Sequence, residues 1–414
     1  MAPAPRDDHD RQDRGLVPAA MAAELLGVKP ATLYAYVSRG SLTSHRRPGE
    51  RGSWFDPAQL DDLARRGRGR GSGRRPDVVI ESGVTLIADG RYWYRGRDPI
   101  ELSATATFEQ VAELLWTASL PADPEPWTPD GRAVGIERSL ADALPEGAPP
   151  MAHLRAAVPL LAAHDPLRTD LRPEAVADVG RHLLATLVAL LPRRGGRPPL
   201  AAGMARRLWA VLARRPPSGG ELAALEAVMV LLADHELAAS TATVRIAASF
   251  RADPYAAVSA GLATLSGAYH GGASALAERL LAEGEAAADA GTVVGEWLAR
   301  GERIPGLGQP LYPDGDPRAR VVVDHARRLA PHAPALVAAD AVASIAAERN
   351  LPRPNVDFGV ATLTRALDWI PRAGETVFAV SRIAGWLAHA IEEYKHRLRY
   401  RPRAVYTGPS MMQE

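Results

Sequence analysis

The sequence predicts a mainly all-α protein with a small basic domain in front of a large helical one. Apolar residues recur at three- and four-residue spacing through most of residues 77–414, for example in 221–250, 321–350 and 375–398. This is the periodicity of amphipathic helices. The stretch 65–76 contains only Gly, Ser, Arg and a final Pro. Because nothing in it can be buried, we expect a flexible linker between the two parts.

Composition places the chain among soluble globular proteins. Its 414 residues are 47% hydrophobic and 23% charged, which is ordinary for that class. The absence of cysteine excludes disulfides, cysteine-ligated zinc and a thiol nucleophile. Residues 1–15 are polar and lack the apolar core of a secretion signal. The longest apolar stretch, HLLATLVALLP, is too short to span a bilayer, so we expect a cytoplasmic protein with no membrane segment.

Charge is distributed unevenly along the chain. The formal net charge is +1, but residues 1–76 hold 14 Lys and Arg against 9 Asp and Glu. The rest of the chain is therefore slightly acidic, and the asymmetry indicates an appended basic module. We expect a domain at 1–64, a basic linker at 65–77 and a helical domain at 78–414.

The N-terminal domain has the pattern of two helices joined by a tight turn. Ala20, Ala23 and Leu26 would form the apolar stripe of the first helix. Gly27 follows that helix where a C-terminal glycine belongs, and Pro30 suits the first turn of the second helix. A basic, hairpin-like wing and a further short helix come next, with Pro48 in the tip of the wing.

This pattern resembles the winged helix-turn-helix of MerR and excisionase-type proteins. The resemblance implies that the second helix enters a DNA major groove and that basic side chains of the wing meet phosphates. The residues expected to contact DNA are Thr32, Tyr34, Tyr36, Arg39, Arg46, Arg47 and Arg51. The same pattern also fits a three-helix module that binds protein, or a vestigial fusion.

Four segments of the large domain place polar residues or turns inside helical surroundings. A histidine interrupts an apolar helix at His235, and His270 precedes two glycines and a helix start. Glycines at such a place allow a ligand close to the backbone, and a helix N-terminus favours negative charge. The loop 304–319 has Pro or Gly at seven of its sixteen positions, and Asp357 follows a proline turn.

In order and spacing these segments resemble the citrate synthase family. The matching motifs are YHGGA, GLGQPLYPDGDPRA, PNVDF and RPRAVYTGP, together with the opening segment 86–116. The resemblance covers about 80–409. It implies a two-subdomain helical fold, with a small subdomain at about 270–362 inserted in the large one.

The resemblance implies a citrate synthase-like acyltransferase, in which the acyl group becomes an alkyl group on transfer. Such an enzyme condenses acetyl-CoA with oxaloacetate to give citrate and CoA. Asp357 would remove a proton from the acyl group, and His270 would donate a hydrogen bond to the enol oxygen. We expect acyl-CoA as a co-substrate, no bound cofactor and no metal.

Oxaloacetate is a dianion, and arginine forks suit its two carboxylates. By position in the family motifs, the substrate-binding residues are His235, Arg318, Arg382 and Arg401. In the family the last of these reaches the site of the partner subunit, so the resemblance implies a homodimer.

Three positions depart from the family pattern. Gln309 stands where the family has a third catalytic residue, a histidine that donates to the attacked ketone. An amide can donate the same hydrogen bond but cannot deliver a proton to the forming alkoxide. Pro313 replaces a basic residue that pairs with a CoA phosphate in many members, and Ala238 replaces a common asparagine.

Three functional hypotheses are compatible with these residues. The first is a citrate synthase, or a relative that uses propionyl-CoA and makes 2-methylcitrate. The second is a DNA-binding transcription regulator whose weakened synthase domain senses a metabolite. The third is an enzyme that also binds DNA. Because Asp357 and His270 are both present, the sequence favours the enzyme.

Overall fold

The computed structural model divides into two units, residues 1–80 and 81–414, called here the N-terminal unit and the main unit. The predicted domain limits remain predictions, because the linker lies outside the described residues. The structure describes residues 16–26, 28, 30–38, 42–46, 52–57, 59–60, 80–131, 134–199, 201–268, 270–287, 289–301, 303–396 and 399–400.

The described part of the N-terminal unit includes two helices, a two-stranded sheet and helical positions at 57 and 59–60. Its elements are β1 (Val17–Pro18), α2 (Ala19–Leu26), α3 (Pro30–Ser38) and β2 (Trp54–Phe55). Strands β1 and β2 pair antiparallel. A small core joins these elements, formed by Ala22, Ala23, Leu33, Leu42, Phe55 and Leu60.

The predicted buried stripe of the first helix is partly wrong. Ala23 is buried, but Ala20 is exposed and Leu26 only partly buried, and Ala22 takes the second core position. The helix begins directly after β1, whose Val17 pairs with Phe55 of β2. Which face of α2 is buried depends on the elements that pack against it, and helical periodicity alone does not contain that information.

The main unit opens with a β-hairpin. Strands β3 (Thr85–Ala88) and β4 (Arg91–Tyr94) pair antiparallel. Asp89 and Gly90 connect them with φ of 49° and 70°, the left-handed pair that a two-residue hairpin turn requires.

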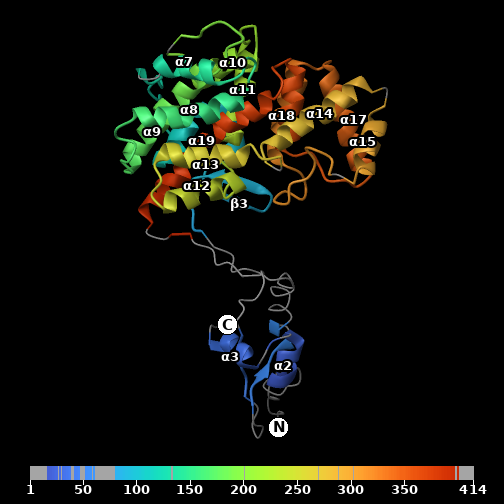
Figure 1. The fold of residues 1–414 in the computed structure, drawn as a ribbon. Coiled ribbons are helices and arrows are strands. Elements are labelled where there is room, and N and C mark those ends of the chain that lie inside the picture. Colours follow the sequence, from blue (N-terminus) through green and yellow to red (C-terminus); the bar gives the residue numbers. More distant parts are fainter. Residues whose placement is uncertain are drawn as a thin grey trace, which may run out of the picture. The chain divides into compact units, whose positions relative to one another are not determined.

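The remaining elements of the main unit in the described ranges are helices (Figure 1). Proline or an Asp, Ser, Thr or Asn cap marks most of their starts, as is usual for helix N-termini. The helices are α5 (Pro99–Thr105), α6 (Phe108–Thr117), α7 (Val134–Ala143), α8 (Pro150–His164), α9 (Pro173–Leu190), α10 (Met204–Leu212), α11 (Gly219–Leu232), α12 (Ala239–Ser249), α13 (Pro254–Leu265), α14 (Gly272–Ala286), α15 (Ala290–Ala299), α16 (Pro317–Leu329), α17 (Pro334–Glu348), α18 (Val356–Ala366) and α19 (Ala373–Lys395).

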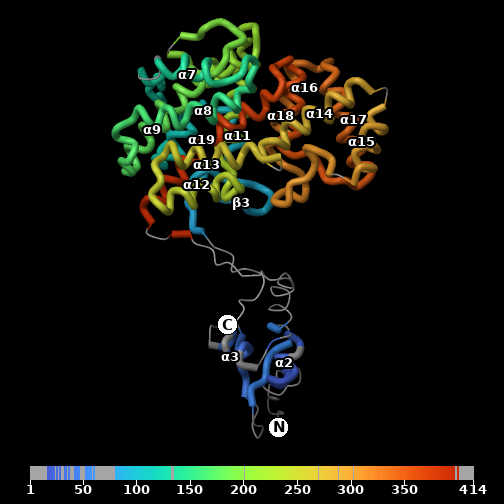
Figure 2. Tube along the Cα trace, in the orientation of Figure 1, coloured from blue at the N-terminus to red at the C-terminus, as the bar shows by residue number. Residues whose placement is uncertain are grey.

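Two hydrophobic cores organise these helices. The larger core surrounds α19, which is buried along most of its 23 residues. The smaller core lies among α14, α15, α17 and α18, between Ala277 and Ala361. Figure 2 shows α14 to α18 gathered on one side, coloured orange, with α19 crossing the other part. The mainly helical fold is thus confirmed.

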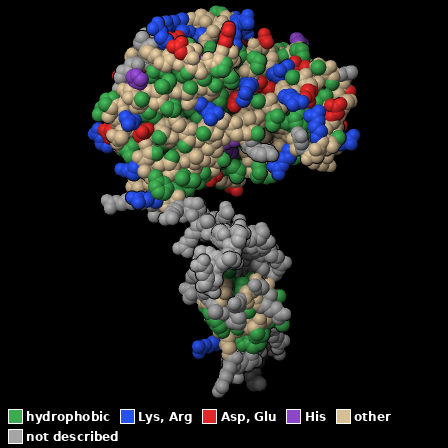
Figure 3. All heavy atoms as spheres, in the orientation of Figure 1, with side chains coloured by type: hydrophobic (Ala, Val, Ile, Leu, Met, Phe, Trp, Pro, Cys, Tyr) green, Lys and Arg blue, Asp and Glu red, His purple; other side chains and the backbone are tan. Residues whose placement is uncertain are grey.

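One face of the main unit is mixed in charge (Figure 3). On the face in Figure 3, acidic and basic side chains are interspersed. Within the described ranges, none of the helices is both long and apolar enough to cross a membrane.

Candidate active site

A cavity of about 910 Å³ in the main unit collects residues from both cores. It is called the central cavity here. Its walls come from the α11–α12 turn, the start of α14, the loop before α16, the start of α18, and α19. Six of the predicted site residues line it, namely His235, His270, Gln309, Arg318, Asp357 and Arg382.

Glycines allow the loop at 304–316 to close against α18. Gly306 has a φ of 76°, and a Cβ there would lie 2.9 Å from the Cβ of Phe358. Gly308, at φ 88°, donates its N–H to the carbonyl of Arg353 at 2.8 Å. No other residue type fits the first position without displacing α18. The stiff loop is therefore a packed wall of the central cavity.

Asn355 and Asp316 attach this loop to the start of α18. The Asn355 side chain caps α18, while its Nδ2 donates to the Gly308 carbonyl at 3.0 Å. The Asp316 carboxylate accepts from the Val356 backbone N–H at 3.0 Å. These contacts fix the position of the loop relative to Asp357, which lies in the first turn of α18.

Arg318 is buried at the start of α16. Its Nε and Nη2 donate to the two carboxylate oxygens of Asp316 at 3.0 and 2.8 Å. The guanidinium carbon lies 5.8 Å from the ring centre of Tyr92 and 5.6 Å from that of Tyr312, distances typical of cation–π contacts. Ion pair and rings together hold this cation in place inside the protein.

Arg382 is the second buried cation, in the middle of α19. Its Nε donates to the Leu232 carbonyl at 2.8 Å, and its guanidinium lies 4.6 Å from the Phe378 ring centre. Its Nη2 is buried without a hydrogen-bond partner among the described atoms. A buried guanidinium with an unused donor is suited to bind an anionic ligand.

His235 lies in the turn between α11 and α12. The continuous helix that the periodicity of 221–250 predicts is wrong, because α11 ends at Leu232 and α12 starts at Ala239. Its Nε2 is 2.9 Å from the Tyr312 hydroxyl. Its ring also contacts Tyr92 edge-on, at 6.0 Å between centres. His235 therefore adjoins the rings that flank Arg318.

His270 precedes α14 and contacts the hydroxyl of Ser240 through Nε2 at 2.7 Å. The Trp386 indole N–H donates to the same hydroxyl oxygen at 3.2 Å. Among the described residues, His270 Nε2 is the acceptor left for the Ser240 proton. This arrangement puts the imidazole proton on Nδ1, because a neutral imidazole has one donor and one acceptor nitrogen.

Both histidines have pKa values below the ordinary range. Burial, and then the charge of Arg382, lower the pKa of His270 to about 4. Burial, and then the charges of Arg318 and Arg382, lower the pKa of His235 well below its ordinary value. Each imidazole is therefore neutral at physiological pH and acts as a hydrogen-bonding group without charge.

Stability is expected to depend on pH through these histidines. Between about pH 6.5 and pH 4 the unfolded chain binds protons that the folded chain does not. The free energy of unfolding should therefore fall as pH is lowered through this range. We expect His270→Asn to reduce the change of unfolding free energy with pH by up to about 1.4 kcal/mol per pH unit. Urea unfolding at about pH 5 and pH 7 measures it, with His332→Asn as an exposed control; identical slopes for both variants would contradict the assignment.

Asp357 faces the cavity from the first turn of α18. The hydroxyl of Ser274 donates to its Oδ1 at 2.5 Å. Burial raises the pKa of Asp357, and the Ser274 hydrogen bond and Arg318 reduce that rise without cancelling it. A carboxylate with a raised pKa is a stronger base than a solvated aspartate.

Gln309 lines the central cavity on the glycine-rich loop. Its side-chain carbonyl lies 3.5 Å from the backbone N of Leu311, the next residue but one. This is a long contact by the usual geometric standard, so the side chain is weakly held within the loop.

The cavity thus combines two chemical functions. Buried cations and a neutral histidine form an anion-binding part around Arg318 and Arg382. A neutral histidine and a carboxylate of raised pKa, His270 and Asp357, form a second part suited to proton abstraction next to a carbonyl. Among the described residues, no group of His, Asp and Glu is placed to hold a metal ion.

Comparison with known proteins gives the family. The family model described as citrate synthase, C-terminal domain, matches residues 74–403. The chain belongs to the citrate synthase family. Citrate synthases use acetyl-CoA as a co-substrate and need neither a metal nor another cofactor.

Curated relatives of this citrate synthase family member include a citrate synthase and a 2-methylcitrate synthase. Citrate synthase 2 of Bacillus subtilis is 33% identical over 361 residues, which cover 80% of this chain and 94% of that protein. A 2-methylcitrate synthase of Mycobacterium tuberculosis is 31% identical over 332 residues, covering 76% of this chain and 84% of that protein. The comparisons support citrate or 2-methylcitrate synthase catalysis without choosing between them.

Solved citrate synthases share the fold of this chain. The enzyme from Thermoplasma acidophilum, solved as a ternary complex with carboxymethyl coenzyme A and oxaloacetate, superposes with a TM-score of 0.72 at 23% identity. That match covers 84% of this chain and 97% of the other. The Thermotoga maritima enzyme gives a TM-score of 0.70 at 24% identity, covering 83% and 97%.

The other predicted site residues are Arg401 and the candidate DNA contacts of the N-terminal unit. Arg401 lies outside the described residues, as do Arg39, Arg47 and Arg51. In the N-terminal unit, Tyr34 is 45% exposed on α3 and Arg46 is exposed, while Thr32 and Tyr36 are partly buried. Their predicted contacts with DNA remain predictions.

Sequence reasoning missed the residues that orient the site. Ser240, Ser274, Tyr312 and Asn355 contact predicted site residues directly. Ser240 stands in the same motif as His235, and Tyr312 in the same loop as Gln309. The motifs could therefore have pointed to these residues as candidates. Only the folded structure shows which of the predicted site residues each of them contacts.

Proposed function

We propose that the protein condenses a short acyl-CoA with oxaloacetate to give citrate, or 2-methylcitrate, and CoA. The observation that carries this proposal is the convergence of Arg318 and Arg382 with His270 and Asp357 on one cavity. Family membership alone would not assign roles to these residues. Arg318 and Arg382 provide the region of the cavity that would bind a dianion. His270 and Asp357 provide the groups for proton abstraction.

In the first step, Asp357 removes a proton from the carbon next to the thioester carbonyl. The Nδ1–H of His270 donates to the carbonyl oxygen as it becomes an enolate. Because His270 stays neutral, it stabilises this oxygen without changing the charge of the site. Ser240 and Trp386 support the assignment, since they orient the ring through Nε2.

In the second step, the enol carbon attacks the ketone carbon of oxaloacetate and forms a C–C bond. Arg318 and Arg382 bind the two carboxylates, and His235 donates a hydrogen bond to oxaloacetate at the same part of the cavity. Gln309 donates a hydrogen bond to the ketone oxygen, which becomes the alkoxide. The proton that Asp357 removed returns through water to this alkoxide and gives the hydroxyl of the product. Hydrolysis of the thioester by water releases CoA and completes the balance of atoms.

The test is CoA release by the purified protein, detected as free thiol with oxaloacetate and acetyl-CoA or propionyl-CoA. The chain has no cysteine and contributes no background. We expect release that requires oxaloacetate. One methylene changes binding in an apolar pocket by about 1–3 kcal/mol, so the ratio of kcat/KM for the two thioesters identifies the preferred acyl group.

Gln309 is expected to limit the rate of this enzyme. Gln309→His should raise kcat about 10-fold, because an imidazole can deliver a proton to the alkoxide, whereas an amide cannot. Gln309→Ala should lower kcat by about 10-fold or more, since losing an oxyanion donor typically costs about 10²–10³. Steady-state CoA release measures both, with Leu311→Ala as a control in the same loop. A Gln309→Ala enzyme of unchanged kcat would remove Gln309 from the mechanism.

We propose a homodimer in which Arg401 of the partner subunit completes the carboxylate-binding part. The family resemblance of the RPRAVYTGP motif supports this assignment. Sedimentation equilibrium should give twice the chain mass of 44.2 kDa. A monomer that condenses both substrates would exclude the shared site.

The winged helix-turn-helix assignment of residues 1–64 and its DNA binding remain predictions from sequence. The family match begins at residue 74 and does not reach this segment. The regulator hypothesis has no observation of its own in favour, whereas the residues proposed for catalysis line the central cavity. A gel-shift titration with nonspecific duplex DNA tests the prediction, and absence of any shift at low salt would end it.

A further inference from the structure

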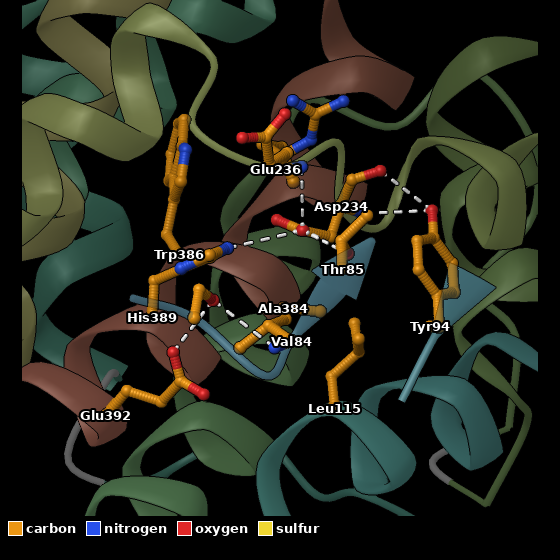
Figure 4. Close-up of polar contacts among 12 residues, drawn as sticks. Val84, Thr85, Tyr94, Leu115, Asp234, Glu236, Ala384, Trp386, His389 and Glu392 are labelled. Carbon is orange, nitrogen blue, oxygen red and sulfur yellow. Dashed lines mark hydrogen bonds and ion pairs between the residues drawn. The ribbon is translucent and has the colours of Figure 1, made fainter. Parts of the chain in front are cut away.

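A buried carboxylate lies directly beside His235 and outside the roles described above. Asp234 is fully buried between α11 and α12. Its Oδ2 accepts hydrogen bonds from the Thr85 hydroxyl at 2.5 Å, from the Glu236 backbone N–H at 3.1 Å and from His389 Nε2 at 3.3 Å. Figure 4 shows these contacts converging from β3, from the turn and from α19.

The contact with Glu236 spans His235 and defines the turn that carries it. Glu236 has a φ of +52°, a left-handed conformation that costs a non-glycine residue about 1–3 kcal/mol. Tyr94 holds the other side of the turn: its hydroxyl accepts from the Asp234 N–H at 3.1 Å and lies 2.8 Å from the Asp234 carbonyl. The strained turn is therefore maintained by the Asp234 side chain and by Tyr94.

His389 holds the Asp234 carboxylate in a defined direction. The Arg245 Nη1 donates to His389 Nδ1 at 3.0 Å, and a guanidinium can only donate. The proton of a neutral His389 is consequently on Nε2, where it points to Asp234. Both His389 and Arg245 are fully buried, so water does not replace this contact.

The same carboxylate adjoins the helix that carries Arg382. At Gly385, one turn after Arg382, an added Cβ would overlap Asp234 Oδ1 and lie 2.5 Å from the Ala233 carbonyl. Helix α19 therefore passes Asp234 with no side chain between them. The negative charge of Asp234 acts on the buried Arg382 guanidinium, which has no carboxylate hydrogen-bonded to it among the described residues.

We propose that Asp234, held by His389 and Thr85, is a positioning residue for oxaloacetate binding. It fixes the turn that aims His235 into the central cavity and balances the charge of Arg382. It touches neither substrate nor the reacting atoms. The inference rests on the proposed function, because it assigns the carboxylate-binding part of the cavity to oxaloacetate.

The test compares the two substrates in Asp234→Ala. We expect the KM and Kd for oxaloacetate to rise about 10-fold or more, while the KM for acyl-CoA stays within about twofold. Thr85→Val removes one donor to the carboxylate and should shift oxaloacetate in the same direction by about threefold. It keeps the inference testable if Asp234→Ala does not fold.

Conservative and matched variants separate positioning from general stability. His389→Gln keeps one acceptor for Arg245 and one donor for Asp234, and should restore binding that His389→Leu loses. Asp165→Asn changes another buried aspartate, hydrogen-bonded by Tyr255 at 3.0 Å, and should leave both KM values unchanged.

A double-mutant cycle asks whether Asp234 acts through its neighbour. In a His235→Ala background, Asp234→Ala should have a much smaller effect on oxaloacetate binding than in the wild type. Equal effects in both backgrounds, or equal rises in both KM values of a folded variant, would overturn the inference while leaving the synthase intact. A wild-type protein that neither binds oxaloacetate by calorimetry nor releases CoA would instead overturn the proposed function, and this inference with it.

Discussion

Asp357→Asn is expected to lower kcat about 10³-fold while oxaloacetate still binds. An amide has the shape of the carboxylate but cannot accept the substrate proton, and a positioned general base contributes about 10²–10⁴. Arg318 and Arg382 are unchanged in this variant, so binding of the dianion should be retained. CoA release measures the rate, and titration calorimetry measures the binding of oxaloacetate.

A matched variant shows whether the loss is specific. Asp142→Asn alters an exposed aspartate of α7 and should leave kcat unchanged. The wild-type kcat should also fall as the pH drops through the raised pKa of Asp357, because only the ionised carboxylate is a base. Full activity in Asp357→Asn would assign the proton abstraction to another group.

Arg382→Met is expected to raise the KM for oxaloacetate about 10²-fold. The substitution removes a buried cation whose Nη2 is unpaired among the described atoms. Loss of one partner from a buried charged pair costs about 2–5 kcal/mol, which is roughly 30- to 5,000-fold in affinity. The binding of acyl-CoA alone should change little, because Arg382 belongs to the carboxylate-binding part of the cavity.

Surface arginines supply the comparison. Arg279→Met removes an i,i+4 ion pair with Glu283 on the exposed face of α14, and pairs of this kind contribute little. We expect its KM for both substrates to equal that of the wild type. If Arg382→Met bound oxaloacetate as tightly as Arg279→Met, the anion-binding role of Arg382 would be wrong.

Much of the fold and of the cavity could be predicted from sequence, because local signals agree with the folded arrangement there. The β3–β4 hairpin follows from strand alternation and an Asp-Gly turn, and the helix starts follow from prolines and capping residues. Linear motifs also preserve order, so the six cavity residues could be selected from their motifs alone. The motifs taken together identify the family fold, and that fold brings the six residues to one cavity.

The break at His235 could not be predicted, because residues on both sides favour helix. The turn there depends on contacts of Asp234 with Thr85 and His389, which are 149 and 155 positions away. Local periodicity contains no information about such partners. The same holds for Ser274 on Asp357, 83 positions apart, and it explains why the orienting hydroxyls were missed while the chemical groups were found.

The most direct measurement is the yield of citrate per CoA released from acetyl-CoA and oxaloacetate, with citrate quantified by mass spectrometry. Condensation in the central cavity predicts equal amounts of the two products, both dependent on oxaloacetate and both lost in Asp357→Asn. CoA released without citrate, or in the absence of oxaloacetate, would show thioester hydrolysis instead and contradict a synthase.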